Sequence, residues 1–307
     1  MSDPSPLLAV RIAPAALLGL ALMLAAGARA QGATGAVTGS DLADACRDRD
    51  GWADPAPPSR IFGNSWYVGT CGISVLLITS REGHVLIDGG PAAAAALVAA
   101  NIERLGFRPT DVRWIVSSHE HDDHVGALAE LKRLTGARVA AIRAAAASLS
   151  TGKPAANDPQ RAVVHDFAPI AIDRILSDGD RLHLGPIDLT VRSTPAHSPG
   201  SASWTWTSCE TRCRKIAYAD SATAISGDAY RFTDHPDRVA GVRAGLSRIG
   251  RLPCDILVTP HPGASELFAR MGGRAPLGDR NACRHYAEAA GARFAARLAE
   301  ERDPAGR

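Results

Sequence analysis

The sequence lacks any strong excess of charge and any run of basic residues. Its 34 Lys and Arg side chains are balanced by 32 Asp and Glu, which gives a formal net charge of +2. Nucleic acid and the membrane surface are therefore not expected as partners, because both require concentrated positive charge. Internal repeats, low-complexity segments and polar linkers are also lacking, so no domain boundary is indicated. Because 46% of the residues are hydrophobic, the chain can bury a core, and a compact enzyme or small-ligand binder remains.

Long apolar stretches are missing beyond the first thirty residues. Arg11 precedes the apolar segment Ile12–Gly27, which is followed by the small-x-small triplet Ala-Arg-Ala of residues 28–30. This order of charge, apolar core and cleavage site predicts a secretory signal peptide over residues 1–30. A membrane anchor is the alternative, but 16 apolar residues fall short of the ~20 that a spanning helix needs. We therefore expect a periplasmic protein of residues 31–307, with a net charge of +1 and no membrane contact after cleavage.

Six cysteines, an even number, occur in this chain, which is expected to be exported: Cys46, Cys71, Cys209, Cys213, Cys254 and Cys283. Disulfides are the expected state in an oxidising compartment. Fifteen pairings are possible and the sequence cannot choose among them, although chain order suggests the local pairs 46–71, 209–213 and 254–283. A zinc site at Cys209 and Cys213 is the alternative. It is disfavoured because no second close Cys or His pair lies beside them.

Short apolar runs and helical stretches follow one another from Trp66 onward, after an irregular segment expected over residues 31–60. Each half of the chain has its strands first and its helices after them. Strands are expected at 75–79, 84–87, 112–117, 203–207, 215–219 and 255–259, with several short ones in 170–194, and helices at 91–105, 125–134, 239–249 and 282–300. The pattern predicts an α/β fold with two packed sheets and helices outside, a four-layer αββα sandwich, in one domain over residues 31–307.

Three of the ten histidines crowd into one segment directly after the expected strand 112–117. Residues 119–124 read His-Glu-His-Asp-Asp-His, which is H-x-H-x-D-H at a junction between strand and helix. In extended chain, alternate side chains point to the same side, so His119 and His121 can share one metal ion. Asp123 and His124 can bind a second ion where the chain turns into the helix. Imidazole and carboxylate are ligands that zinc prefers, and a polar loop that is His-rich by chance is the alternative.

Two further histidines follow apolar strands in similar loops. His197 lies in Thr194–Ser201 (TPAHSPGS) and His261 in Thr259–Ser265 (TPHPGAS). A lone histidine is more often structural, but the shared setting at a strand end favours a ligand role. Each of two zinc ions would then keep an open position, which is typical of a catalytic site, and the pair could share a hydroxide of lowered pKa. The expected ligands are His119, His121 and His197 for one ion and Asp123, His124 and His261 for the other.

With these motifs the sequence resembles the metallo-β-lactamase superfamily, and most closely its subclass B3. The resemblance covers nearly the whole chain after residue 30. It is carried by Leu-Ile-Asp-Gly-Gly at 86–90, the H-x-H-x-D-H segment, TPAHSPGS, Tyr-Ala-Asp-Ser at 218–221 and TPHPGAS. The first motif is specific only to the superfamily, whereas TPHPGAS without a cysteine ligand is specific to the subclass. The resemblance implies the αββα sandwich, the six ligands named above and two Zn²⁺ ions per chain. Family members with three disulfides have a pairing similar to the local one that chain order suggests here.

The resemblance also implies residues that contact the substrate. Ser221, at a position where another subclass has a cysteine ligand, and Thr223 would bind the β-lactam carboxylate through their hydroxyls. Asp88 would be the carboxylate that orients a zinc ligand, and a turn residue before two glycines is an equal alternative. Gln160 matches a substrate-facing glutamine of some members, but its loop aligns poorly, and a plain surface loop is the better interpretation.

The implied activity is hydrolysis of the β-lactam amide bond of penicillins, cephalosporins and carbapenems, which confers antibiotic resistance. A metal-bound hydroxide would attack the carbonyl carbon. One zinc ion would polarise the carbonyl oxygen and the other would stabilise the departing ring nitrogen. Asp123 would be the catalytic residue that holds the hydroxide and the second ion in register. Small β-lactams are the expected partners, and the absence of an interface stripe favours a monomer.

Three other functions compete with this interpretation. A lactonase or a glyoxalase II-like thioesterase shares the fold and would use Asp220 as an extra ligand that bridges both metals. A zinc-storage protein needs fully occupied ligand positions or many low-complexity histidines, and neither is found. Ser150-Thr151-Gly152-Lys153 matches the S-x-x-K motif of serine enzymes, but S-D-N, K-T-G and G-x-S-x-G are absent, so serine catalysis is rejected.

Overall fold

Two β-sheets form the centre of the structure, a computed structural model that describes Met1 and residues 35–303. Apart from Met1, the expected signal peptide lies outside the described residues. The first sheet has the strand order β1 (Ser59–Phe62), β2 (Ser65–Tyr67), β3 (Leu76–Ser80), β4 (Gly83–Ile87), β5 (Val112–Val116), β6 (Arg138–Ile142) and β7 (Arg174–Leu176). The second has the order β12 (Ile256–Val258), β11 (Cys213–Tyr218), β10 (Ala202–Cys209), β9 (Ile187–Ser193) and β8 (Arg181–Leu184).

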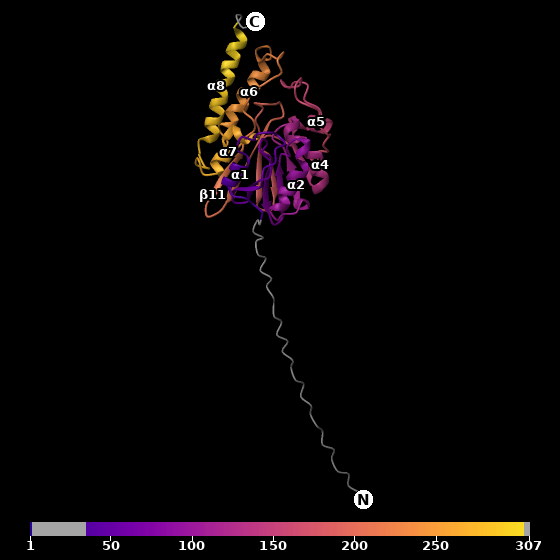
Figure 1. Ribbon diagram of the computed structural model, residues 1–307. Helices are drawn as coiled ribbons and strands as arrows, with labels where there is room; N and C mark the ends of the chain where they lie inside the picture. Colours follow the sequence, from indigo (N-terminus) through magenta and orange to yellow (C-terminus); the bar gives the residue numbers. More distant parts are fainter. Residues whose placement is uncertain (2–34, 304–307) are drawn as a thin grey trace. The chain divides into compact units, whose positions relative to one another are not determined.

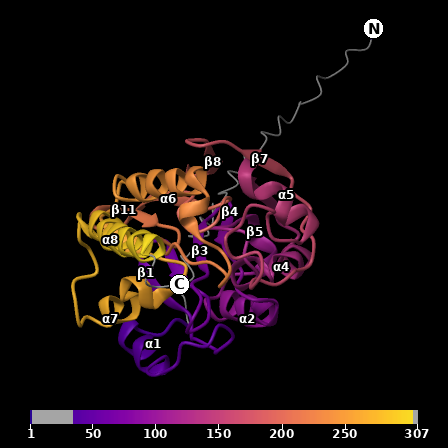
Figure 2. The same ribbon diagram turned by 90° about the horizontal axis from the view of Figure 1, so that it is seen from above.

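Helices cover the outer face of each sheet. Figure 1 shows α2 (Ala95–Arg104), α4 (Leu128–Thr135) and α5 (Arg143–Thr151) on one side, and α6 (Pro236–Ile249) and α8 (Ala282–Arg302) on the other. The view from above places the strands between these two groups of helices (Figure 2). The predicted αββα sandwich is therefore confirmed. The short helices are α1 (Gly39–Ala45), α3 (Asp122–Val125) and α7 (Leu267–Met271), with 3-10 turns η1 (Ala92–Ala94), η2 (Pro109–Asp111), η3 (Phe232–Asp234) and η4 (Pro262–Ser265).

The position of each strand in the hydrophobic core explains the pattern of apolar residues along it. Every residue of β4 is buried, as expected for a strand covered on both faces. In β9 the side chains of Ile187, Leu189 and Val191 are buried while the residues between them are partly exposed, which is the period of two of a strand with one buried face. One core cluster contains side chains from both sheets, and a second lies between the second sheet and helices α6 and α8.

The directions of the strands gather several loops at one edge. β4 and β5 are parallel, so their carboxyl ends meet. In the second sheet β10 is antiparallel to both β9 and β11, and β12 is parallel to β11, so β9, β11 and β12 all run the same way. The two sheets are joined at this edge, because Trp204 Nε1 donates to the Ser117 carbonyl (2.9 Å) and Ala202 N donates to the Ser118 carbonyl (2.6 Å). The loops after these five strands therefore lie together.

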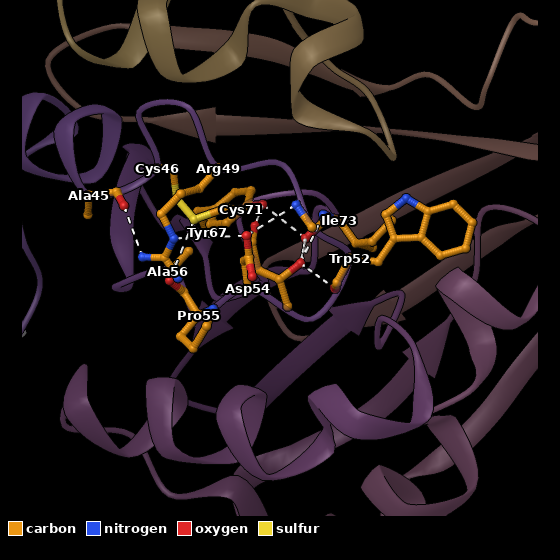
Figure 3. Close-up of a disulfide and its surroundings, with 12 residues drawn as sticks. Ala45, Cys46, Arg49, Trp52, Asp54, Pro55, Ala56, Tyr67, Cys71 and Ile73 are labelled. Atoms are coloured by element: carbon orange, nitrogen blue, oxygen red, sulfur yellow. Dashed lines mark hydrogen bonds and ion pairs between the residues drawn. A yellow bond between two sulfur atoms is a disulfide. The ribbon is translucent and has the colours of Figure 1, made fainter.

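Three disulfides pair the six cysteines in the order that the chain suggested: Cys46–Cys71, Cys209–Cys213 and Cys254–Cys283. The first, drawn in Figure 3, holds the segment before β1 against the turn between β2 and β3. Beside it, Thr70 Oγ1 donates to the Trp52 carbonyl and Cys71 N donates to the Asp54 carbonyl, each at 2.8 Å. The disulfide and these bonds fix the position of Trp52.

Several elements differ from the expectation. Residues 31–60 were expected to be irregular, but they contain α1 and the start of β1, and β6 and α5 were not predicted. The start of α1 had a signal in the sequence, because Thr38 and Asp41 form a capping box. The helix expected at 125–134 corresponds to α4, and the separate short helix α3 precedes it. At this break a Cβ on Gly126 would lie 2.4 Å from the Asp122 carbonyl oxygen, so the chain turns where only glycine fits.

The described residues from 35 onward belong to one unit. Within the described part of the chain, no helix combines the length and the apolar character needed to span a membrane.

Candidate metal centre

The loops at the shared edge carry all six expected metal ligands. His119 and His121 lie between β5 and α3, and Asp123 and His124 lie in the first turn of α3. His197 follows β9 and His261 follows β12. Strand ends more than 100 residues apart in the chain thus supply one site.

The first expected set of ligands is assembled as the sequence suggested. His119, His121 and His197 are buried, and one ring nitrogen from each lies within 4.8 Å of the others. The ring centroid of His119 is 4.7 Å from those of both His121 and His197, and the latter two are 5.0 Å apart. We refer to these residues as the three-histidine group.

The second expected set lies directly beside the first. Asp123 Oδ2 is 3.0 Å from His124 Nε2 and 3.3 Å from His261 Nε2. His119, Asp123 and His124 also have ligand atoms within 4.8 Å of one another, so His119 lies between the two groups. His261 is the most exposed of the ligands, with 35% of its side chain accessible, and its ring is 5.0 Å from that of His124.

The free polar atoms of the site fit metal ions. Nε2 of His119 is buried and has no hydrogen-bond partner among the described residues, and Nε2 of His124 is buried beside the Asp123 carboxylate but lacks hydrogen-bond geometry to it. Buried polar atoms normally have such a partner, because an unpaired one costs about 1–3 kcal/mol. A metal ion would satisfy these nitrogens, and a set of imidazoles with one carboxylate suits zinc.

Each buried histidine is held from its other ring nitrogen. Asp220 Oδ1 is 2.8 Å from His119 Nδ1, and Asp158 Oδ2 is 2.8 Å from His121 Nε2. Asp88 Oδ2 is 3.3 Å from His124 Nδ1, and His197 Nδ1 donates to the Thr223 carbonyl at 2.8 Å. Such partners fix ring orientation. The opposite nitrogen of His119 has no hydrogen-bond partner among the described residues, whereas that of His124 faces Asp123 and that of His197 lies 3.2 Å from the amide nitrogen of Gln160. The sequence suggested this role only for Asp88, because nothing in the chain pattern around Asp158 separates it from a loop residue.

Asp88 has both of the roles that the sequence left open, a turn residue and a carboxylate that orients a histidine. It is a turn residue with a positive φ of 63°. Its carboxylate also accepts hydrogen bonds from Ser118 N (2.6 Å), Ser118 Oγ (2.7 Å) and Tyr218 OH (2.7 Å) in addition to facing His124. Asp88 therefore joins β4, the loop after β5 and β11 beneath the site.

Burial and neighbouring charges set the protonation of the ligands. Burial, together with the nearby imidazoles, lowers the pKa of both His119 and His197 well below the usual range. Burial alone would raise the pKa of Asp123, but His124 and then His261 outweigh it and lower that pKa far below the ordinary value. These two neutral imidazoles and the ionised carboxylate are in the protonation states that bind metal ions. For the other two buried histidines the carboxylates outweigh burial: Asp158 raises the pKa of His121, and Asp123 with Asp88 raises that of His124 to about 10, so a metal ion must displace a proton from each.

The residues expected to contact substrate lie around the metal ligands. Ser221 is buried, directly after Asp220. Thr223 is exposed, and its Oγ1 lies 3.0 Å from His197 Nδ1. Gln160 is buried, with its amide nitrogen 3.2 Å from His197 Nε2, so the interpretation of this position as a plain surface loop is wrong. Beside Gln160, the Pro159 carbonyl accepts a hydrogen bond from Gly227 N of the loop after β11 (3.0 Å), so the two loops are in contact here.

Comparison with known proteins agrees with this geometry. A family model described as the metallo-beta-lactamase superfamily matches residues 68–210. The crystal structure of the metallo-β-lactamase MIM-1 from Novosphingobium pentaromativorans is 61% identical, with a TM-score of 0.84 over 85% of this chain and 97% of that one. The chain belongs to the metallo-β-lactamase superfamily.

The resemblance to subclass B3 metallo-β-lactamases is also confirmed. MEM-A1, a subclass B3 metallo-β-lactamase isolated from a soil metagenome library, is 40% identical with a TM-score of 0.79 over 82% of this chain and 98% of that one. A hydroxyacylglutathione hydrolase from Fuscovulum blasticum is 27% identical over 60% of this chain. This chain spans 57–59% of the length of the first curated relatives it matches.

Proposed function

We propose that this member of the superfamily is a dizinc metallo-β-lactamase. It hydrolyses the amide bond of penicillins, cephalosporins and carbapenems, and it thereby confers antibiotic resistance. The observation that carries the proposal is the 61% identity with MIM-1 over 97% of that enzyme's chain. The six side chains gathered at the shared edge of the two sheets support it.

The proposed ligands are the three-histidine group for one zinc ion and Asp123, His124 and His261 for the other. When bound, the zinc ions supply Lewis acidity and a water nucleophile that is active at neutral pH. Asp123 is ionised and faces His124 and His261 beside the three-histidine group, so its carboxylate can accept a hydrogen bond from the attacking water and orient it. We assign Asp123 as the catalytic residue on this basis.

The chain's own hydrogen-bond donors would position the substrate. The hydroxyls of Ser221 and Thr223 would donate to the β-lactam carboxylate, and Thr223 is exposed next to His197 as this role requires. The amide of Gln160 reaches the same histidine from the opposite loop, so it can contact a bound substrate. Such groups hold the reacting amide in one orientation at the metal ligands.

A thioesterase or a lactonase is the second candidate, because hydroxyacylglutathione hydrolases are among the relatives. Such an enzyme would use Asp220 as a ligand to both metals. Here Asp220 Oδ1 lies 2.8 Å from His119 Nδ1, on the side of the ring opposite the free Nε2. Asp220 is in neither group of converging ligand atoms, so its position favours the β-lactamase.

We further propose that residues 1–30 direct export and that residues 31–307 act in the periplasm as a monomeric catalytic domain. The charge, apolar core and cleavage triplet of the first segment support export. Three disulfides in the described residues support an oxidising compartment. The balanced charge supports small molecules rather than nucleic acid or lipid as partners.

The decisive experiment is metal removal and restoration. Purified protein of residues 31–307 is assayed with a penicillin, a cephalosporin, a carbapenem, a lactone and a thioester, first with zinc, then with chelator and then with zinc again. We expect β-lactam turnover that disappears with chelator and returns with zinc. Turnover of only the lactone or thioester would support the second candidate, and folded protein with two bound zinc ions but no β-lactam turnover would overturn the proposal.

The Asp123→Ala variant separates an enzyme from a zinc-storage protein. In an enzyme, loss of the carboxylate lowers turnover by about 100-fold or more, because the water is no longer oriented. In a storage protein the same change lowers only zinc affinity. A variant that keeps wild-type turnover would contradict the role assigned to Asp123.

A further inference from the structure

Glu120 is a buried carboxylate that the mechanism does not use. It lies between two ligands, His119 and His121, in the H-x-H-x-D-H segment, and its exposed fraction is 0%. Because alternate side chains point to opposite sides, Glu120 points away from the metal ligands and into the protein. A buried carboxylate is costly unless it is fully hydrogen-bonded, so its presence between two metal ligands requires an explanation.

The hydrogen bonds of Glu120 all lead to the loop that carries the third histidine. Ser198 Oγ donates to Glu120 Oε2 at 2.6 Å, and Gly200 N donates to Glu120 Oε1 at 2.8 Å. Ser198 directly follows His197, so one carboxylate joins the backbone of His119 and His121 to that of His197. Ser198 is itself fixed, because its N–H donates to Ser201 Oγ at 3.0 Å.

The loop after β9 is shaped to accept this carboxylate. An ideal Cβ on Gly200 would lie 2.5 Å from Glu120 Oε2 and 2.8 Å from the Cα of Ala145. Any side chain at this position would therefore push the carboxylate and the loop apart. Close approach of the two loops requires both the length of a glutamate and the absence of a side chain at Gly200.

We propose that Glu120 is a positioning residue that sets the distance between the loop of His119 and His121 and the loop of His197. The three histidines reach the site from two loops in different sheets, and their ring nitrogens must stay within bonding distance of one ion. Glu120 and Ser198 form the direct side-chain link between these loops. The affinity of the three-histidine group for zinc therefore depends on a residue that does not touch the metal. The inference rests on the proposed zinc site, but not on the identity of the substrate.

The length of the side chain distinguishes positioning from a simple effect of charge. Glu120→Asp keeps the negative charge but is one methylene shorter, so it cannot reach both Ser198 Oγ and Gly200 N. Ser198→Ala keeps Glu120 and removes one of its two donors. Glu301 provides a matched control, because it is a mostly buried glutamate that joins two segments by accepting from Thr233 N (2.8 Å) and Arg297 Nε (2.8 Å).

The experiment measures zinc stoichiometry and affinity by competition with a chromophoric chelator, and it records the absorption spectrum of the cobalt-substituted protein. We expect Glu120→Asp to lower the binding affinity for one of the two zinc ions by about tenfold or more and to change the absorption spectrum of the cobalt-substituted protein. Ser198→Ala should shift both readouts in the same direction by a smaller amount. Glu301→Asp should lower the Tm of the metal-free protein while leaving both zinc affinities unchanged.

Three results would overturn the proposal. The first is a folded Glu120→Asp variant with wild-type zinc affinities. The second is an equal loss of affinity in Glu301→Asp, which would show only a general effect of stability. The third applies if Glu120→Asp does not fold: a Ser198→Ala variant with wild-type zinc affinities would then overturn the proposal. Zinc affinity is measured without substrate, so a failure of β-lactam turnover in the wild-type protein leaves this test intact.

Discussion

The rings of His119 and His121 are each held by a carboxylate from a distant part of the chain, Asp220 for the first and Asp158 for the second. The six proposed metal ligands could be named from spacing alone, because H-x-H-x-D-H and two Pro/Gly-flanked histidines each follow an apolar strand. Their outer partners could not be found in the same way. Asp158 and Asp220 lie 37 and 101 residues from the histidines they hold, so only the folded chain brings them into contact.

Gln160 shows how a local pattern misleads at this scale. Its Asn-Asp-Pro-Gln setting is typical of a surface turn. The residue is nevertheless buried: its amide contacts His197, and the loop after β11 is hydrogen-bonded to the neighbouring Pro159 carbonyl through Gly227 N. Burial of a polar loop depends on a second loop that is distant in sequence, and no local rule contains that information.

The contact between Asp158 and His121 leads to a prediction for a single substitution. Asp158→Asn removes the charge that faces His121 Nε2 at 2.8 Å, so the ring is held less firmly and its metal-facing nitrogen becomes less basic. We expect zinc affinity to fall by about 10–100-fold. Titration against a chromophoric chelator measures the change.

Asp166→Asn is the matched control for this substitution, since Asp166 is an exposed acidic residue further along the same loop. It should bind zinc as the wild-type protein does. Equal affinities in the Asp158 and Asp166 variants would show that the contact with His121 does not support metal binding.

At the scale of elements, the period of the apolar residues and the turn residues between them were sufficient to predict the positions of most strands and of the long helices. β4, β5, β11, β12 and α8 lie within a few residues of their expected positions. The missed elements have weaker signals. α5 is Ala-rich and directly follows β6 without a turn between them, so no boundary in the sequence separates strand from helix.

The disulfides allow a test of how elements are held together. Cys254–Cys283 joins the start of α8 to the segment before β12 and closes 29 residues, whereas Cys209–Cys213 closes only 4 at the β10–β11 hairpin. A longer closed loop restricts the unfolded chain more. Replacing the first pair by alanine should cost about 3–4 kcal/mol and the second about 2 kcal/mol.

Urea denaturation of the two double variants and the wild-type protein measures this difference. The slopes of free energy against urea must agree for the comparison to be valid. A larger loss from the hairpin pair than from the α8 pair would contradict the chain-entropy explanation for this protein.

At the scale of the whole molecule, the sandwich could be predicted because its strands and helices follow in a recognisable order. The meeting of the two sheets at one edge could be inferred only from the histidines, because a shared metal centre requires the histidines of the two sheets to lie close together. The hydrogen bonds from Trp204 and Ala202 to the loop before His119 hold this edge together, and neither residue stands out in the sequence.

Because the ligands come from both sheets, zinc should stabilise the whole fold. With free zinc about 1,000-fold above the dissociation constant, each site adds about 4 kcal/mol to the free energy of unfolding. For a domain of this size, this corresponds to a rise in Tm of about 10 °C per site. Differential scanning calorimetry with zinc and with chelator tests the expectation.

His119→Ala is the control for this experiment, because it removes one of the three ligands proposed for the first ion and leaves the three proposed for the second. The difference in its Tm between zinc and chelator should be about half that of the wild-type protein. A wild-type Tm that is the same in both conditions would show that the six side chains do not form a metal centre.

The position of β12 has a consequence for how the centre matures. Among the described residues β12 is the last strand, it lies at the edge of its sheet, and His261 comes three positions after its end. During synthesis, five of the six proposed ligands emerge before this strand. Tight binding of the second ion therefore requires β12 to be in place, whereas the three-histidine group is complete before this strand is made.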